Sequence, residues 1–321
     1  MIIIQIHLVF DGGLAKGVEI LKHRLGPLCL SAAAAIWGGM YVVSKVVLAC
    51  IPSWILLEWR FVIALFILGL WALRKREWRV KPGDLWLFAL IGLVGYTGSI
   101  GLQFIGTHLS GAAMGSLITS ASPALISLFA WWILKEKLNL SKTSALLLAT
   151  IGVLIVSDLT GLTASSPSFA GNLALIGAAL TWALYTVLSR LKTVTYTSLT
   201  VTFWANTFGV IFTAPFFVWE YRNHPFTVPH SLWIWIGILY IGIISTALAF
   251  YLWNKGFEYV DAATGSLFFF IQPIVGSLLG AFTLGEKLSW NFYLGALLIA
   301  GGIYLSALKK SDKRHSLSKM M

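Results

Sequence analysis

Apolar runs long enough to cross a lipid bilayer constrain this chain more than any other feature of its sequence. A helix needs about 20 apolar residues to span about 30 Å of hydrocarbon, and such runs recur along most of the chain. They fall at 26–50, 53–73, 84–106, 110–134, 141–158, 171–191, 198–219, 231–254, 261–284 and 289–308. The sequence therefore predicts an all-α integral membrane protein with ten transmembrane helices.

Composition supports a membrane protein and excludes an ordinary soluble domain. Of the 321 residues, 58% are hydrophobic and only 11% are charged, against about 25% charged in a typical soluble domain. The net charge of +11 comes from Lys and Arg in short segments between the apolar runs, which indicates topology signals and not a nucleic-acid-binding face. The two cysteines, Cys29 and Cys50, lie near opposite ends of one predicted helix, so no disulfide is expected within the chain.

An internal repeat divides the chain into two halves. Residues around Pro123 recur 150 positions later around Pro273, and residues around Trp37 recur 145 positions later around Trp182. Each half holds five predicted spans, an odd number, so the second half must enter the membrane from the opposite side. Inverted repeats of this kind are a basis for alternating access, because one backbone asymmetry can be adopted in either direction.

The repeat and the distribution of basic residues predict the organisation of the chain. With the N-terminus inside, Lys and Arg gather in the inner segments, and the outer loops keep only Arg222 and Lys287; the positive-inside rule then places both termini in the cytoplasm. The opening residues lack the basic n-region of a signal peptide, although the sequence leaves open whether residues 1–24 are the true start. The expected parts are an N-terminal cytoplasmic tail (1–25), a first repeat (26–158), a linker (159–170), a second repeat (171–308) and a basic cytoplasmic C-terminal tail (309–321).

Two prolines stand near the middle of predicted spans. Pro123 and Pro273 deprive the carbonyl groups four residues earlier, at Thr119 and Phe269, of their helical N–H partners. Inside a bilayer these carbonyl groups need water, a side chain or a ligand. The paired placement predicts that the fourth and ninth helices bend around a central polar cavity. Plain packing kinks, with neighbouring hydroxyl groups satisfying the backbone, are the alternative.

Polar side chains inside apolar spans are further site candidates, because exposing them to lipid is costly. Gln272, next to Pro273, is the preferred hydrogen-bonding partner for a substrate, although a helix-to-helix hydrogen bond explains it equally well. Glu58 is the only carboxylate well inside a span; it is a candidate for proton coupling or for an ion pair with Lys45, and Arg60 lies two residues after it. The other polar candidates for the substrate pathway are Tyr96, Gln103, Tyr185, Tyr251 and Asn254.

These segments resemble the drug/metabolite transporter superfamily, in its ten-helix form built from two EamA domains. The first half carries "AAAAIWGGMYVVSK" from Ala32, "RFVIAL" from Arg60 and the pattern "GSL…P…LKEKL". The second half carries "GAALTWALYTVLSR" from Gly177 and the pattern "GSL…QP…LGEKL". The resemblance covers about residues 26–308, and the chain departs from it at Lys135, where the family has a glycine.

The resemblance implies a substrate path between the halves, lined mainly by the first, third and fourth helices and by the sixth, eighth and ninth. Trp37 and Trp182 match the family's Trp in the first and sixth helices, and Arg60 matches its Arg in the second. The implied function is secondary transport, as an exporter of small amino-acid-like or drug-like metabolites by alternating access. Substrate, direction and proton coupling stay open, because the family motifs mark the scaffold more than the cargo.

Other function classes remain as alternatives: a facilitative channel, a membrane-embedded enzyme, or a scaffold without transport. The sequence has no ATP-binding loop, zinc motif or cysteine cluster, so no cofactor, metal site or enzymatic activity is expected. The expected partners are a small-molecule substrate and the lipid of a bacterial cytoplasmic membrane, with no nucleic acid. Two fused halves make a monomer sufficient and leave a dimer open.

Overall fold

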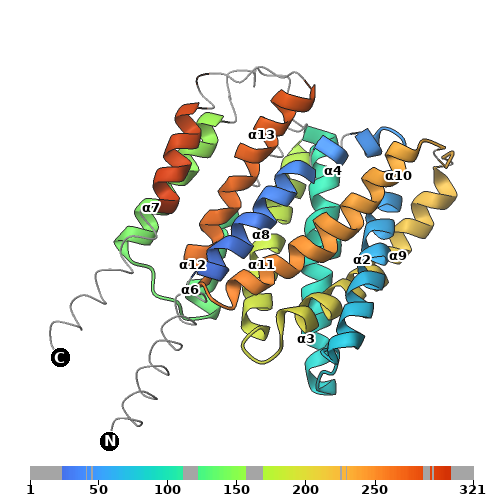
Figure 1. Cartoon of the computed structure of the whole chain (residues 1–321), viewed down its shortest axis with the longest axis horizontal. Helices are drawn as coiled ribbons and strands as arrows, with labels where there is room; N and C mark the ends of the chain where they lie inside the picture. Colours follow the sequence, from blue (N-terminus) through green and yellow to red (C-terminus); the bar gives the residue numbers. More distant parts are fainter. Residues whose placement is uncertain are drawn as a thin grey trace, which may run out of the picture.

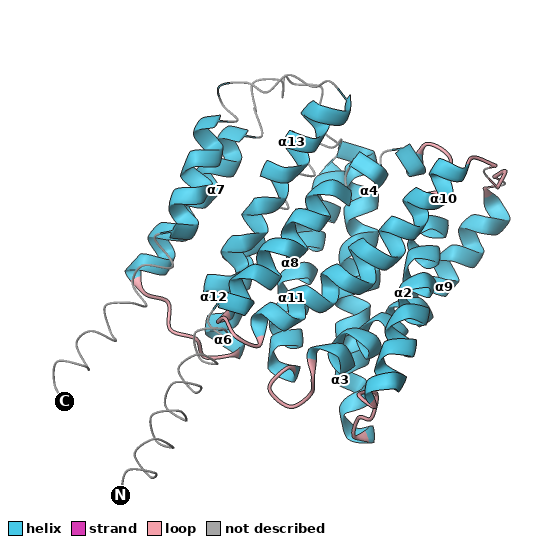
Figure 2. Ribbon diagram, in the orientation of Figure 1, coloured by secondary structure: helices cyan, strands magenta, loops and turns pink. Residues whose placement is uncertain are grey.

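The computed structural model is helical throughout its regular structure (Figure 2). It describes residues 24–40, 42–44, 46–110, 122–156, 169–224, 226–228, 230–284, 290 and 293–304. Within these residues, seven helices are long and apolar enough to cross a membrane: Arg24–Leu48, Ser53–Lys75, Pro82–Gly106, Ala170–Lys192, Ser198–Asn223, Leu232–Phe257 and Ala262–Thr283. Shorter apolar helices cover Ser122–Ile133 and Tyr293–Tyr304. The prediction of an all-α chain with membrane spans is confirmed, and the count of ten spans stays a prediction.

Several of these spanning helices consist of consecutive helical elements. After the helix Arg24–Leu48, the first half contains α2 (Ser53–Lys75), the 3-10 turn η1 (Pro82–Asp84), α3 (Leu85–Ile91), α4 (Gly101–Ser110), α6 (Ser122–Ile133) and α7 (Leu140–Val156). The second half contains α8 (Phe169–Lys192), α9 (Ser198–Asn223), α10 (Leu232–Leu239), α11 (Ala249–Phe257), α12 (Ala262–Gly265), the 3-10 segment η5 (Ser266–Phe270) and α13 (Ile271–Leu284), before the helix Tyr293–Tyr304.

Two of the spanning helices contain a π-helical segment in their middle. The segment η2 (Gly92–Ile100) joins α3 to α4, and η4 (Tyr240–Leu248) joins α10 to α11. In a π-helix each backbone N–H group donates to the carbonyl of the fifth residue before it, not the fourth. Such segments are frequent at functional sites. Within η4, the hydroxyl of Thr246 also donates to the carbonyl of Ile241, five residues back, at 2.7 Å. The two π segments occupy corresponding places in the third and eighth predicted spans.

The halves pack against each other through these segments. The helix α2 lies along α9, and each of the two also contacts the π segment of the other half: α2 contacts η4, and α9 contacts η2. The helix α8 packs against α4, η2 and α6. In Figure 1, α2 and α9 stand side by side at one end of the bundle, and α7 stands at the opposite end.

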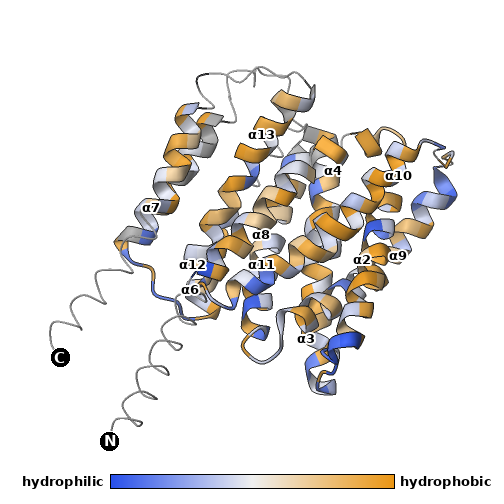
Figure 3. Ribbon diagram, in the orientation of Figure 1, coloured by the Kyte–Doolittle hydropathy of each residue, from blue (hydrophilic) through white to orange (hydrophobic). Residues whose placement is uncertain are grey.

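The outer surface of the bundle is apolar. Hydrophobic residues lie along the sides of the helices, and hydrophilic residues lie mostly near the helix ends (Figure 3). Large side chains such as Phe66 (66% exposed), Phe282 (84%) and Trp290 (86%) point away from the protein interior. A soluble domain rarely exposes so much contiguous apolar surface, whereas this distribution matches the lipid core and the two interfaces of a bilayer.

Carboxylates from one half cap helix starts in the other half. Glu220, near the end of α9, accepts hydrogen bonds from the backbone N–H groups of Trp54 (2.7 Å) and Ile55 (3.0 Å) in the first turn of α2. Glu136, after α6, accepts from the N–H groups of the first two residues of α12 at 2.9 and 3.2 Å. Because the first N–H groups of a helix have no intrahelical partner, these two acids complete helix ends that belong to the opposite half.

An ion pair reinforces the start of α12. Asp261 Oδ1 lies 2.6 Å from Lys142 Nζ of α7 and accepts the N–H of Thr264 at 2.9 Å. Burial acts to raise the pKa of Asp261, but the hydrogen bonds from Lys142 and Thr264 outweigh it and hold that pKa below its ordinary value. The charged carboxylate therefore ties α7 to the second half.

Glycines let α9 approach the first π segment closely. A Cβ atom added to Gly92 would lie 2.6 Å from the carbonyl oxygen of Ala205, and one added to Gly209 would lie 2.7 Å from Cβ of Tyr96. Small residues at helix contacts permit this distance between backbones in a membrane. The crossing of η2 and α9 therefore depends on the absence of side chains at these two positions.

We predict that Gly92→Ala destabilises the protein because the new methyl group meets main-chain atoms of α9. Overpacking of this kind costs about 1–3 kcal/mol, which lowers the midpoint of thermal unfolding of the purified protein in detergent. The control is Gly83→Ala, where an added Cβ meets nothing within 4 Å. Equal midpoints for the two variants would contradict the close crossing.

Candidate functional site

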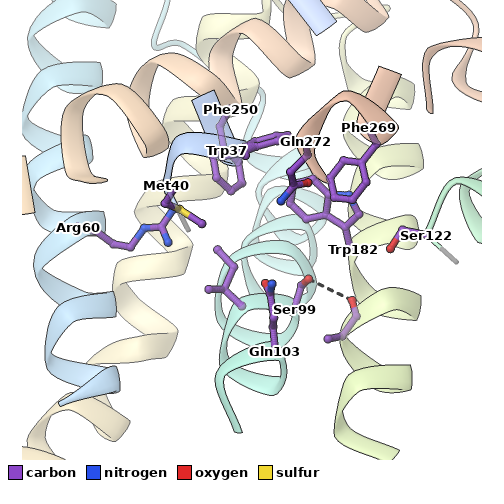
Figure 4. Close-up of a pocket in the computed structure, with 12 residues that line it drawn as sticks. Trp37, Met40, Arg60, Ser99, Gln103, Ser122, Trp182, Phe250, Phe269 and Gln272 are labelled. Atoms are coloured by element: carbon purple, nitrogen blue, oxygen red, sulfur yellow. Dashed lines mark hydrogen bonds between the residues drawn. The ribbon is translucent and has the colours of Figure 1, made fainter. Parts of the chain in front are cut away.

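A cavity of about 50 Å³ lies where the two halves meet (Figure 4). It has room for roughly four water molecules and is too small for a metabolite in this conformation. Its walls come from both halves and include residues of the two helices that contain Pro123 and Pro273. The lining residues are Trp37, Met40, Arg60, Ser99, Ile100, Gln103 and Ser122 from the first half, and Ala178, Trp182, Phe250, Phe269 and Gln272 from the second.

Three pairs of lining residues correspond to each other by the offsets of the sequence repeat. They are Trp37 with Trp182, Ile100 with Phe250, and Ser122 with Gln272. The first pair is separated by 145 positions and the other two by 150, as in the repeat itself. Equivalent positions of the two halves therefore face one shared space.

The two tryptophans differ in their hydrogen bonds. Trp37 Nε1 donates to the carbonyl of Ser245, in η4, at 2.9 Å. Trp182 Nε1 is buried and has no partner among the residues that the structure describes. The two rings meet edge to face, with centroids 5.2 Å apart. By the repeat offset, the counterpart of the Ser245 carbonyl is that of Gly95 in η2, so one of two related contacts is made and the other is not.

Arg60 is the only charged residue among the described residues of the cavity lining. Its side chain is 2% exposed, and its Nε donates to the hydroxyl of Thr246 in η4 at 2.8 Å. Three ion pairs occur within the described residues, and none of them includes Arg60. A guanidinium group stays protonated in proteins, so a buried positive charge borders the cavity without a carboxylate among the described residues to balance it.

Gln272 faces the cavity from the second half. Its Oε1 is buried and has no hydrogen-bond partner among the described residues. The side chain lies beside Trp182 and across the cavity from Arg60 (Figure 4). Its backbone is held close to the first helix, because a Cβ atom on Gly38 would lie 2.7 Å from the Gln272 carbonyl oxygen. The hydroxyl of Ser99, by contrast, already has a partner within the protein, because it donates to the carbonyl of Ala178 at 3.1 Å.

The predicted site residues fall into several groups. Five line the cavity, namely Trp37, Gln103, Trp182, Gln272 and Arg60. Pro123 and Pro273 are not in the lining, but each directly follows a lining residue, Ser122 or Gln272. The segment η5 ends three residues before Pro273, so the ninth predicted span changes its helical type where the proline was expected to disturb it.

The remaining polar candidates are not among the lining residues. Tyr96, Tyr185 and Asn254 are buried. The Tyr185 hydroxyl lies 3.5 Å from Asn254 Oδ1, and Asn254 Nδ2 donates to Thr202 at 2.9 Å. Tyr251 packs against Trp71, with ring centroids 4.5 Å apart. These side chains hold helices together in this conformation.

Of the charged candidates, Arg60 lines the cavity and Glu58 does not. Glu58 is buried outside the cavity lining, and its Oε2 has no partner among the described residues. No ion pair joins it to Arg60, since two positions apart on a helix do not share a face. Lys45 and Thr119 lie outside the described residues.

Several lining residues were not expected from the sequence. Ser122 could have been found as the repeat counterpart of Gln272, and Ile100 with Phe250 as a pair at the same offset. Met40, Ser99 and Ala178 carry no such signal, because small or apolar residues in a span resemble every other packing position. Phe269 belongs to an aromatic run whose inward member only the structure identifies.

Comparison with known proteins identifies relatives along almost the whole chain. The profile of the EamA-like transporter family matches twice, at residues 24–158 and 169–308. The protein named "Uncharacterized transporter YetK" of Bacillus subtilis is 28% identical over 303 residues, covering 93% of this chain and 91% of that protein. An "Uncharacterized transporter" of Archaeoglobus fulgidus is 27% identical over 286 residues, covering 88% and 97%. A solved crystal structure shares the fold with a TM-score of 0.73 at 22% identity, covering 88% of this chain and 96% of the other.

We predict that Trp37→Phe destabilises the protein more than Trp182→Phe. Both changes remove the same part of the indole ring, but only the first leaves the buried Ser245 carbonyl without its partner. Such a loss costs about 1–3 kcal/mol, so the thermal unfolding midpoint in detergent falls further for Trp37→Phe. A Trp182→Phe variant that is equally or less stable would contradict the assigned hydrogen bonds.

Proposed function

Because the chain belongs to the EamA-like transporter family, we propose that it is a secondary transporter that exports a small metabolite across the bacterial cytoplasmic membrane. The observation that carries the proposal is the cavity, because both halves contribute equivalent residues to it, such as Trp37 and Trp182. A binding site shared by two repeats is where repeat-built transporters place their cargo. Export is the direction that the family resemblance implies.

The transport cycle we propose is alternating access by two inverted repeats. The cavity is too small for a metabolite here, so cargo requires a conformational change that widens it. The contact from Trp37 to the Ser245 carbonyl, without its counterpart from Trp182, supports a state in which one of two related gates is closed. In the opposite state, Trp182 donates to the carbonyl of Gly95 and Trp37 is released.

The topology we propose is ten spans with both termini in the cytoplasm. The distribution of Lys and Arg in the sequence supports it, since the inner segments carry nearly all of them. A single chain supplies both walls of the cavity, which supports a functional monomer. Glu58 is the residue we propose for any proton coupling, because it is a buried carboxylate in a spanning helix.

We predict that overproduction of the wild-type protein enriches specific metabolites in the culture medium, and that Gln272→Leu abolishes this enrichment. Leucine keeps the approximate size of the side chain and removes its hydrogen-bonding group from the cavity. Untargeted mass spectrometry of medium and cell extract measures the effect, with all variants expressed to the same level.

The matched control is Thr283→Ala, an exposed position on the same helix α13, which should export as the wild type does. If medium and cell extract show no change that depends on the wild-type protein, export is contradicted. If Gln272→Leu exports normally, the cavity is not the cargo site.

A further inference from the structure

The unbalanced charge of Arg60 points to the chemistry of the cargo. A charge buried away from water costs several kcal/mol unless an opposite charge or hydrogen bonds compensate for it. The hydroxyl of Thr246 accepts from Nε of Arg60, and the described residues provide no carboxylate within ion-pair distance. The guanidinium group borders the cavity (Figure 4), so a ligand there can supply the missing anion.

Arg60 also breaks the symmetry of the cavity. Its repeat counterpart, 145 positions later, is Ala205, which is apolar and is not in the lining. The paired lining residues described above are uncharged in both halves. A single cationic pole therefore stands on one side of a site that is otherwise built from matched positions, which gives a bound ligand a defined orientation.

Aromatic rings form the body of the site. Trp37, Trp182, Phe250 and Phe269 line it, with neighbouring ring centroids between 5.2 and 6.3 Å apart. Such walls favour an apolar or aromatic group. Across the cavity from Arg60, Gln272 Oε1 and Trp182 Nε1 have no partner among the described residues, so one acceptor and one donor beside the cavity are unsatisfied without a ligand.

Among the lining residues that the structure describes, none has an acidic side chain. A cationic ligand would therefore meet only the positive charge of Arg60, and the ammonium group of a zwitterion would find no carboxylate. Like charge in a site of low dielectric constant disfavours binding strongly. These features select a ligand with net negative charge.

We propose that the cargo is a small organic anion. Its carboxylate pairs with the guanidinium group of Arg60, its apolar body lies against the aromatic rings of the cavity wall, and a polar group at its far end meets Gln272. Arginine is suited to this role because its planar fork binds a carboxylate in bidentate fashion. The inference rests on the proposed transport function, since the cavity must widen to admit such a ligand.

The test uses three probes with one apolar body and different charge: 3-phenylpropionate, 3-phenylpropanol and 3-phenylpropylamine. Their binding to the purified full-length protein is measured by isothermal titration calorimetry. We expect the carboxylate to bind at least about tenfold more tightly than the alcohol, a difference of about 1.4 kcal/mol, and the amine to bind most weakly. Equal binding of all three, a preference for the amine, or no binding of the carboxylate would overturn the proposal.

The variant Arg60→Gln tests whether this residue causes the preference. We expect it to lower the affinity for 3-phenylpropionate about tenfold and to leave the affinity for 3-phenylpropanol within a factor of about two, while Arg60→Lys retains part of the preference. The control is Arg74→Gln, an exposed arginine of the same helix α2, which should behave as the wild type does. If Arg60→Gln keeps the full preference for the carboxylate, the assignment to Arg60 is wrong; if it does not fold, the comparison of probes on the wild type still decides.

Counterflow of radiolabelled 3-phenylpropionate into proteoliposomes separates this inference from the proposed function. Arg60-dependent binding without any counterflow would overturn transport and keep the anion site. Export of a neutral or cationic metabolite that depends on Gln272, together with no preference for the carboxylate, would keep transport and overturn the anion site.

Discussion

Every backbone polar group in a membrane span must find its partner inside the protein, and the structure depends on this constraint. Water cannot satisfy a free N–H or carbonyl group in hydrocarbon. Here the ends and irregular turns of several helices are completed by side chains from the opposite half: Glu220 caps α2, Glu136 caps α12, and Trp37 donates to the main chain of η4. The halves are therefore joined by specific hydrogen bonds as well as by apolar packing.

The same constraint explains why a change of conformation would proceed between defined states. A π segment offers backbone groups in a register that a neighbouring side chain can satisfy, and η4 is held by both Trp37 and Arg60 through Ser245 and Thr246. Arg60 thus contacts a segment that alternating access would move and borders the cavity that would receive cargo. An anion bound to its guanidinium group would act on the helix contact and the binding site together.

Much of this organisation was predictable from the sequence. A helix that spans a bilayer needs a long apolar segment, and the repeat is visible as matching residues in the two halves of the sequence. The all-helical fold, the EamA family and the pairing of Trp37 with Trp182 follow from such patterns. The π segments were not predictable, since their hydrogen-bond register leaves no mark in the periodicity of apolar residues. Nor could the sequence separate Gln272, which faces the cavity, from Tyr251, which packs against Trp71: both are polar residues in apolar spans, and only the packing of the helices distinguishes them.

Alternating access is tested most directly by the accessibility of the cavity from outside the cell. In a protein whose Cys29 and Cys50 are replaced by serine, a Ser122→Cys substitution places a thiol in the lining, and its reaction with a membrane-impermeant thiol reagent reports the outward-open population. Trp37→Phe removes a hydrogen bond of the present state, and Trp182→Phe would remove the one proposed for the opposite state, so the two should shift the reaction rate in opposite directions. A shift in the same direction, or no shift in either variant, would contradict a cycle built on two related gates.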